Sequence, residues 1–183
     1  MAISQAQDAA VRPALQDVLR GMRQGIFARR QDAGFMAALR RGSPDQVAYN
    51  APFHRVLAAL EGFDPSPEWL RPLAVIAMGM ALTVDGSPAG GRDGAVLARA
   101  GLTESRFSRL LASRGEGLQD QLLLLARMLR AREMAPSWQD LGALALADAL
   151  GSEWADETRV RLATAYYRAA DAGGTTTSTI VNQ

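Results

Sequence analysis

The sequence predicts an all-α protein, and three of its properties support this prediction. Hydrophobic residues make up 48% of the 183 positions, and most of them are Ala and Leu, which are good helix formers. Aromatic residues, which favour strands as β-branched residues do, make up only 6%. Apolar residues also recur every three or four positions along most of the chain, the spacing of one helix face. A chain of this length is expected to form one domain or two small ones.

The first half of the chain is expected to hold four helices. They are predicted at residues 5–23 (or 13–23, if Pro13 begins the helix rather than kinking it), 27–39, 51–60 and 66–83. Ser66 is a candidate N-cap, and Pro67 suits the first helical position. The helix that follows is apolar nearly all round, so we expect it to be buried. Residues 42–45 are predicted to form a turn.

A Gly- and Pro-rich segment, DGSPAGGRDG at residues 85–94, is predicted to divide the chain. The expected organisation is an N-terminal helical bundle, a linker loop, a C-terminal helical bundle and a polar, disordered tail, at residues 1–84, 85–94, 95–172 and 173–183 respectively. The two small bundles are expected to contain roughly seven to nine helices in all.

The second half is expected to begin with a short helical turn and to continue with four helices. These elements are predicted at residues 95–100, 103–113, 118–132, 137–150 and 153–170. Leucines at 118, 122, 125 and 129 recur at the spacing of a packed bundle helix. Ser137 and Asp140 resemble a capping box at the start of the next helix.

No recognisable catalytic centre is present in the sequence. The chain has no Cys, which excludes disulfides, a thiolate nucleophile, iron–sulfur clusters and the usual structural zinc sites. The sole histidine, His54, has no paired base, so we interpret it as a structural or surface residue. The carboxylates fall in no acid–base or metal motif, and residues 85–94 lack the Lys-Ser/Thr of a phosphate-binding P-loop. We therefore expect no enzyme activity, no metal and no cofactor.

The sequence also carries no membrane or export signal that we recognise. Residues 1–10 lack the basic and apolar regions of a signal peptide. The longest apolar run, residues 73–84, is far shorter than the roughly 20 residues that a bilayer requires. We therefore expect a cytoplasmic protein that does not associate with membranes.

Arginine is the residue type in which function should be sought. All 20 cationic residues are Arg and none is Lys, a bias that a GC-rich genome can produce without functional cause. The distribution of charge is more informative: residues 12–55 and 99–132 carry net charges of +5 and +4, whereas residues 56–98 and 133–183 carry −3 and −4. Such segregation can build a basic face on a nearly neutral protein, or it can serve charge pairing between neighbouring helices.

Several arginines are spaced to share a helix face. Arg106 and Arg109 are three residues apart, as are Arg127 and Arg130, which lie beside the leucine stripe. Arg40 and Arg41 end a predicted helix, where a cation also interacts favourably with the helix dipole.

Four segments resemble the CasB family, the small subunit of the type I-E CRISPR surveillance complex Cascade. GAVLARAGLTESRFSRLLASR, at residues 94–114, is similar to the family's short Leu-Ala/Gly-Arg-Ala segment followed by a Glu-x-Arg helix opening and a terminal Arg. Residues 117–146 resemble its long Leu-rich helix and Trp-containing turn, and residues 38–57 its Arg-Arg segment. Ala165-Tyr166-Tyr167 matches the aromatic end of its last helix. The resemblance covers residues 27–170; the N-terminal stretch is longer than the family pattern and the body is less basic.

The resemblance implies a non-catalytic subunit in antiviral defence. It implies two helical bundles, and two copies of the chain head to tail in the ribonucleoprotein. The implied partners are the other Cascade subunits with their guide RNA, the target DNA backbone and the second copy. The subunit would stabilise the R-loop by holding the target strand and guiding the displaced strand, while the guide RNA reads the sequence.

Nucleic-acid-binding residues are carried over from the same resemblance. The positions that match best are Arg41, Arg99, Arg106, Arg114 and Arg127. Three more, Arg40, Arg109 and Arg130, are added because they are adjacent to these positions on the predicted helices. The alternative hypothesis is a helical protein–protein adaptor or regulator that uses its Arg clusters to bind acidic partners.

Overall fold

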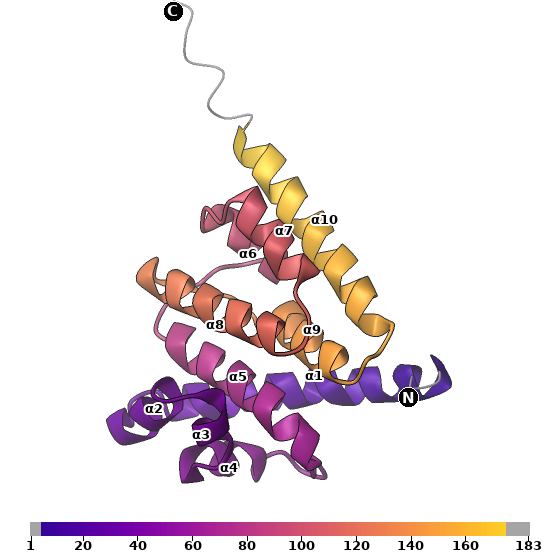
Figure 1. Cartoon of the computed structure of the whole chain (residues 1–183). Helices are drawn as coiled ribbons and strands as arrows, with labels where there is room; N and C mark the ends of the chain where they lie inside the picture. The colour runs from indigo at the N-terminus through magenta and orange to yellow at the C-terminus, as the bar shows by residue number, and fades with distance from the viewer. Residues whose placement is uncertain (1–4, 175–183) are drawn as a thin grey trace, which may run out of the picture.

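The computed structural model describes residues 5–174, with side chains described from Ala14 to Gly173. This part of the chain contains ten α-helices and two strands of two residues each (Figure 1). The predicted all-α fold class is therefore confirmed. None of the helices in the described range is long and apolar enough to cross a membrane. From residue 175 onward, the predicted disordered tail lies outside the described residues.

Five helices form the first half of the fold and five the second. The first five are α1 (Gln5–Ala28), α2 (Ala33–Arg40), α3 (Pro44–Ala48), α4 (Ala51–Leu57) and α5 (Pro67–Thr83). The others are α6 (Asp93–Arg99), α7 (Glu104–Ala112), α8 (Gly115–Ala131), α9 (Gln139–Ala149) and α10 (Trp154–Gly174), with β1 (Ser87–Pro88) and β2 (Met134–Ala135) between them.

The count exceeds the expected seven to nine helices because the region of residues 23–48 is divided differently. The first helix continues to Ala28, and the second begins only after Asp32, whose carboxylate accepts a hydrogen bond of 2.9 Å from the Phe35 amide. The predicted turn at residues 42–45 leads into the short helix α3, because Ser43 and Gln46 form a capping box there. Both differences follow from local capping that the apolar periodicity does not reveal.

Helix α5 lies at the centre of the core, as its apolar sequence predicts. Every residue from Pro72 to Thr83 is buried, and the helix contacts α1, α2, α3, α8 and α9. Gly79 permits a close approach of the Trp138 ring to α5, since a Cβ atom at Gly79 would lie 2.1 Å from that ring. The buried hydrophobic residues of both halves form one continuous cluster. The division into two bundles at residues 85–94 stays a prediction.

The Gly- and Pro-rich segment 85–94 is paired in part. Its strand β1 runs parallel to β2, with the Ser87 amide donating to the Glu133 carbonyl at 2.8 Å and the Ala89 amide donating to the Ala135 carbonyl at 3.1 Å. Pro88 lacks an amide proton, but in a two-stranded ladder it can occupy an edge. The segment is therefore held against the end of α8.

Asp93 links the start of α6 to the start of α9. Its side chain is fully buried and accepts hydrogen bonds from the amides of Ser137, Trp138, Asp140 and Leu141, at 2.9 to 3.2 Å, and from the Ser137 hydroxyl at 2.8 Å. Burial raises the pKa of the Asp93 carboxyl, although the Leu141 and Ser137 donors act in the opposite direction. The predicted Ser137–Asp140 capping box is wrong: Trp138 is the N-cap, with φ at 62°, and Asp93 satisfies the free amides of α9.

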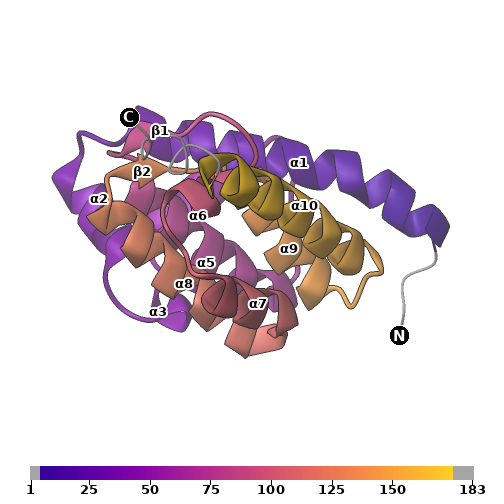
Figure 2. The same cartoon turned by 90° about the horizontal axis from the view of Figure 1, so that it is seen from above.

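Helix α10 covers α6 and α9 along most of its length (Figure 1). The approach to α6 is close, because a Cβ atom on Gly94 would lie 2.2 Å from the Leu162 carbonyl oxygen. Tyr166 stacks on Phe107 of α7 with ring centroids 3.9 Å apart, and its hydroxyl donates to the Leu102 carbonyl at 2.6 Å. Seen from above in Figure 2, α1 runs along one side of the molecule and α7 and α8 lie on the opposite side. Helices α7 and α8, which carry four of the predicted arginines, thus lie away from α1.

Candidate nucleic-acid interface

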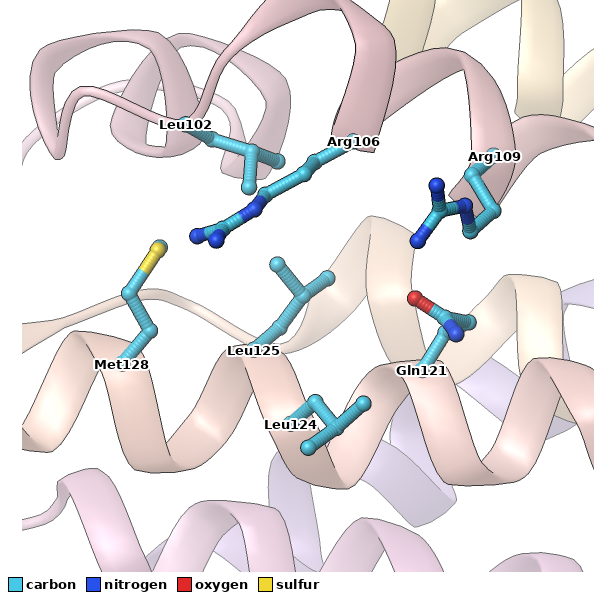
Figure 3. Close-up of a pocket in the computed structure, with 7 residues that line it drawn as sticks. All are labelled: Leu102, Arg106, Arg109, Gln121, Leu124, Leu125 and Met128. Atoms are coloured by element: carbon cyan, nitrogen blue, oxygen red, sulfur yellow. The ribbon is translucent and has the colours of Figure 1, made fainter.

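A groove separates α7 from α8 and contains two of the predicted arginines (Figure 3). Its volume is about 320 Å³. Leu102, Arg106, Arg109, Gln121, Leu124, Leu125 and Met128 line it. The lining includes no carboxylate, so the groove combines an apolar floor with positive charge.

The α7 side of the groove is set by the way this helix packs. Phe107 and Leu110 are buried, Phe107 completely so, which directs Arg106 and Arg109 to the solvent-facing side. In Figure 3 the Arg106 side chain extends across the groove toward Met128, and Arg109 points toward Gln121. The prediction that the two arginines share a face is confirmed.

The α8 side follows from the leucine stripe. All four predicted stripe residues, at 118, 122, 125 and 129, are buried. Leu124 lies off the stripe and is 53% exposed, and Arg127 and Arg130 are exposed on the outer surface of the same helix. The structure therefore places two predicted arginines on α7, where they line the groove, and two on α8, where they are exposed but do not line it.

Five of the eight predicted site residues have guanidinium groups without an ion pair or hydrogen bond to another described residue. Arg41, Arg106, Arg109, Arg127 and Arg130 are exposed. The described residues offer none of the five an ion pair or a side-chain hydrogen bond. Arg41 lies at the end of α2, in the first half of the fold, and is not part of the groove.

Two other predicted residues brace the fold. Arg40 donates to the Ala81 carbonyl at 2.8 Å and forms an ion pair of 2.5 Å with Asp85, which ties α2 to the end of α5. Arg99 donates to the Gly90 carbonyl and so holds the loop before α6. The observed contacts of Arg40 and Arg99 are therefore those of arginines that stabilise the fold.

Arg114, the eighth predicted residue, lies at the connection between α7 and α8, where part of its side chain contacts other residues. Its guanidinium lies 3.5 Å from Asp156 and 3.8 Å from Asp148, and it donates to the Leu111 carbonyl at 2.8 Å. Just over half of its side chain, 54%, remains exposed. Arg114 could therefore reach a phosphate only in competition with two carboxylates.

The sequence did not indicate the importance of Arg159, which holds the connection between α7 and α8 in place. Its side chain is 9% exposed, pairs with Asp148 at 2.5 Å and Asp156 at 3.0 Å, and donates to the carbonyls of Leu111 and Ser113. The only sequence signal was the three-residue spacing of Asp156 and Arg159, which is typical of an exposed helix pair. Spacing alone did not indicate that Arg159 is buried.

The remaining polar groups offer little acid–base or metal chemistry in the described part of the chain. No group of three or more His, Cys, Asp or Glu side chains there could hold a metal ion. His54 is exposed on α4 and makes an edge contact with Phe53, with ring centroids 5.6 Å apart. Asp93, the one deeply buried carboxylate without a cationic partner among these contacts, serves to cap α9. The α7–α8 groove is therefore the strongest candidate site.

Comparison with known proteins identifies the family. The family model described as CRISPR-associated protein Cse2 matches residues 35–167, which is well over half of the chain. Neither the curated proteins nor the solved structures contain a match to the chain. The matched range includes α7, α8 and the groove between them, and it confirms the resemblance seen in the sequence. The chain therefore belongs to the Cse2 family, the CasB small subunit of the type I-E Cascade complex in CRISPR antiviral defence.

Proposed function

We propose that this Cascade subunit is non-catalytic and holds nucleic-acid backbone through the arginines of α7 and α8. In this role it supports the target strand and the displaced strand of the R-loop. The observation that carries the proposal is the placement of Arg106 and Arg109 in a groove that no carboxylate lines. Arg127 and Arg130 add two exposed cations on the neighbouring helix α8.

The physical basis is phosphate neutralisation. Each guanidinium that contacts a phosphate releases condensed counterions, so affinity falls as salt rises and the slope reports the number of contacts. Such contacts carry no base information, which suits a subunit in a complex whose guide RNA reads the sequence. The net charge of the chain is only +1, so the binding must come from the local concentration of arginines rather than from the charge of the whole protein.

The predicted arginines differ in the intramolecular contacts that they would have to break in order to bind a phosphate. Arg41, Arg106, Arg109, Arg127 and Arg130 have no intramolecular bonds to break among the described residues. Arg40, Arg99 and Arg114 would have to exchange existing contacts for phosphate. We therefore assign the larger contributions to the first group.

The proposal includes the partners of the subunit. They are the other Cascade subunits with their guide RNA, the target DNA backbone and a second copy of this chain. We propose the cytoplasm as the place where this assembly works.

The proposal is tested by measuring DNA binding of the full chain by fluorescence anisotropy, from about 50 to about 200 mM salt. We expect weak, sequence-independent binding that declines steeply with salt. The double variant Arg106→Ala/Arg127→Ala should bind more weakly and reduce the salt slope by about two, one for each lost phosphate contact. The matched control is Arg20→Ala, which removes an exposed arginine that Asp17 already pairs at 2.7 Å.

Two results would contradict the proposal. Binding that does not change with salt would exclude phosphate contacts as its source. If the double variant and the Arg20→Ala control bind DNA with equal affinity, the binding site does not lie on α7 and α8. An adaptor for acidic proteins is the hypothesis that such results would favour.

A further inference from the structure

The floor of the α7–α8 groove is apolar, and an apolar floor is not needed for phosphate contacts. Leu124 is 53% exposed although its neighbours on the outer face of α8, Asp120 and Arg127, are charged. Leu102 and Leu125 continue the apolar surface inward, and the partly buried Met128 extends it along the groove. A concave site that combines an apolar floor with a few polar groups is typical of a ligand pocket.

Three side chains that line the groove can contact a planar ligand: Arg106, Met128 and Gln121. The guanidinium of Arg106 lies across the groove opening in Figure 3, and such a planar cation stacks favourably on aromatic rings. Met128 adds a polarisable thioether, which makes favourable contacts with aromatic rings. Gln121 offers both a donor and an acceptor at the α8 side. The groove thus fits a planar, partly apolar group that carries hydrogen-bonding edges.

We infer that the α7–α8 groove accepts an unpaired nucleobase of a single strand whose phosphates contact the flanking arginines. The inference rests on the proposed function and adds to it the class of nucleic acid that the groove selects. Charge complementarity supports this occupant: Arg106 and Arg109 line the groove, and no carboxylate does. A duplex hides the faces of its bases, so only an unpaired strand can offer both a base and a phosphate.

The groove is not expected to distinguish one base from another. The amide of Gln121 can donate or accept, and every base has a face that can lie on Leu124 or under Arg106. The groove is therefore expected to select single strands over duplexes, and not to select one sequence over another. This agrees with a subunit that acts on strands which another molecule has already read.

The test compares three probes with the full chain: a single-stranded oligothymidine, an abasic strand of the same length, and a duplex. The abasic strand retains every phosphate and lacks every base. We expect the oligothymidine to bind about fivefold more tightly than the abasic strand. The variant Leu124→Ala should abolish that difference without weakening binding to the abasic strand.

The matched control is Val160→Ala, which truncates an apolar side chain that is 65% exposed on α10. Both positions are on the surface, so neither variant should unfold the protein. Photo-crosslinking of a strand that contains 4-thiothymidine supplies a second measurement. We expect the crosslinked peptide to contain Leu124 or Met128.

The outcomes separate this inference from the proposed function. If the oligothymidine and abasic strands bind equally, with the same salt dependence, the base site is wrong and the phosphate contacts remain. If neither strand binds in a salt-dependent way, the proposed function fails and the inference fails with it. Crosslinks confined to another surface, or an unchanged preference in Leu124→Ala, would also overturn the base site.

Discussion

Arg159 and Asp148 form an ion pair of 2.5 Å, and each side chain is less than one-tenth exposed. The pair joins α10 to the end of α9. The same arginine donates to the Leu111 and Ser113 carbonyls, and the other Asp148 oxygen accepts from the Gly115 amide at 2.6 Å. The connection between α7 and α8 is therefore held by a buried charge pair.

Removing one member of this pair should strongly destabilise the fold. We expect Arg159→Met to lower the free energy of unfolding by about 3–5 kcal/mol, because the buried Asp148 carboxylate then keeps only the more distant and half-exposed Arg114 as a cationic neighbour. Urea denaturation followed by circular dichroism measures the change. The double variant Arg159→Met/Asp148→Leu should recover part of the loss, since no charge then remains buried. A cost of less than about 1 kcal/mol for the single variant would show that the pair is solvated.

Asp156 is expected to limit nucleic-acid binding. It is 76% exposed and lies 3.5 Å from Arg114, so Asp156→Asn removes a negative charge and weakens the hold on that arginine. We expect the affinity for single-stranded DNA to rise by about two- to threefold at low salt. Asp17→Asn on α1 is the control for loss of one exposed acid. If the two variants behave alike, Arg114 does not contact nucleic acid.

Asp93 should contribute to stability mainly as a cap. Asp93→Ala would leave several buried amides at the start of α9 without an acceptor, and we expect a loss of more than about 3 kcal/mol. Urea denaturation at neutral pH checks this value. A loss of less than about 1 kcal/mol would mean that water replaces the carboxylate.

The titration of Asp93 gives a separate prediction. Because burial raises the pKa of its carboxyl, the folded protein binds a proton that the unfolded chain has released, at pH values between the unfolded pKa of about 3.9 and the folded pKa. The stability of the wild type relative to Asp93→Asn should therefore fall as pH rises through this window and then level off. The check is a series of urea denaturations from acid to neutral pH. A relative stability that rises with pH would mean that the amide donors outweigh burial.

Two glycine substitutions should have opposite effects. Gly79→Ala places a methyl group 2.1 Å from the Trp138 ring, and we expect a loss of about 2–4 kcal/mol because neither α5 nor the buried ring can move freely. Gly117→Ala on α8 meets no atom within 4 Å and should stabilise the protein by up to about 1 kcal/mol. Thermal melting of both variants measures the contrast. Equal shifts in melting temperature would contradict the close packing of α5 against Trp138.

Local patterns in the sequence were sufficient to predict most of the helices and the faces they bury, but not the short helix α3 or the boundary between α1 and α2. The leucine stripe of α8 and the shared face of Arg106 and Arg109 follow from a repeat of 3.6 residues, which acts over one or two turns. The burial of α5 follows from a sequence that is apolar nearly all round. The family resemblance rested on the order and spacing of the same segments. Each of these features can be read from neighbouring residues, without knowing which helices meet.

The roles of individual charges could not be predicted in this way. Arg159 and Arg106 are both arginines on amphipathic helices, yet one is buried against Asp148 and the other lines an open groove. Asp93 caps a helix more than 40 residues away in the sequence. Burial and ion pairing depend on which surfaces the folded helices bring together, and that long-range arrangement is what separates an arginine that braces the fold from one that is free to bind a phosphate.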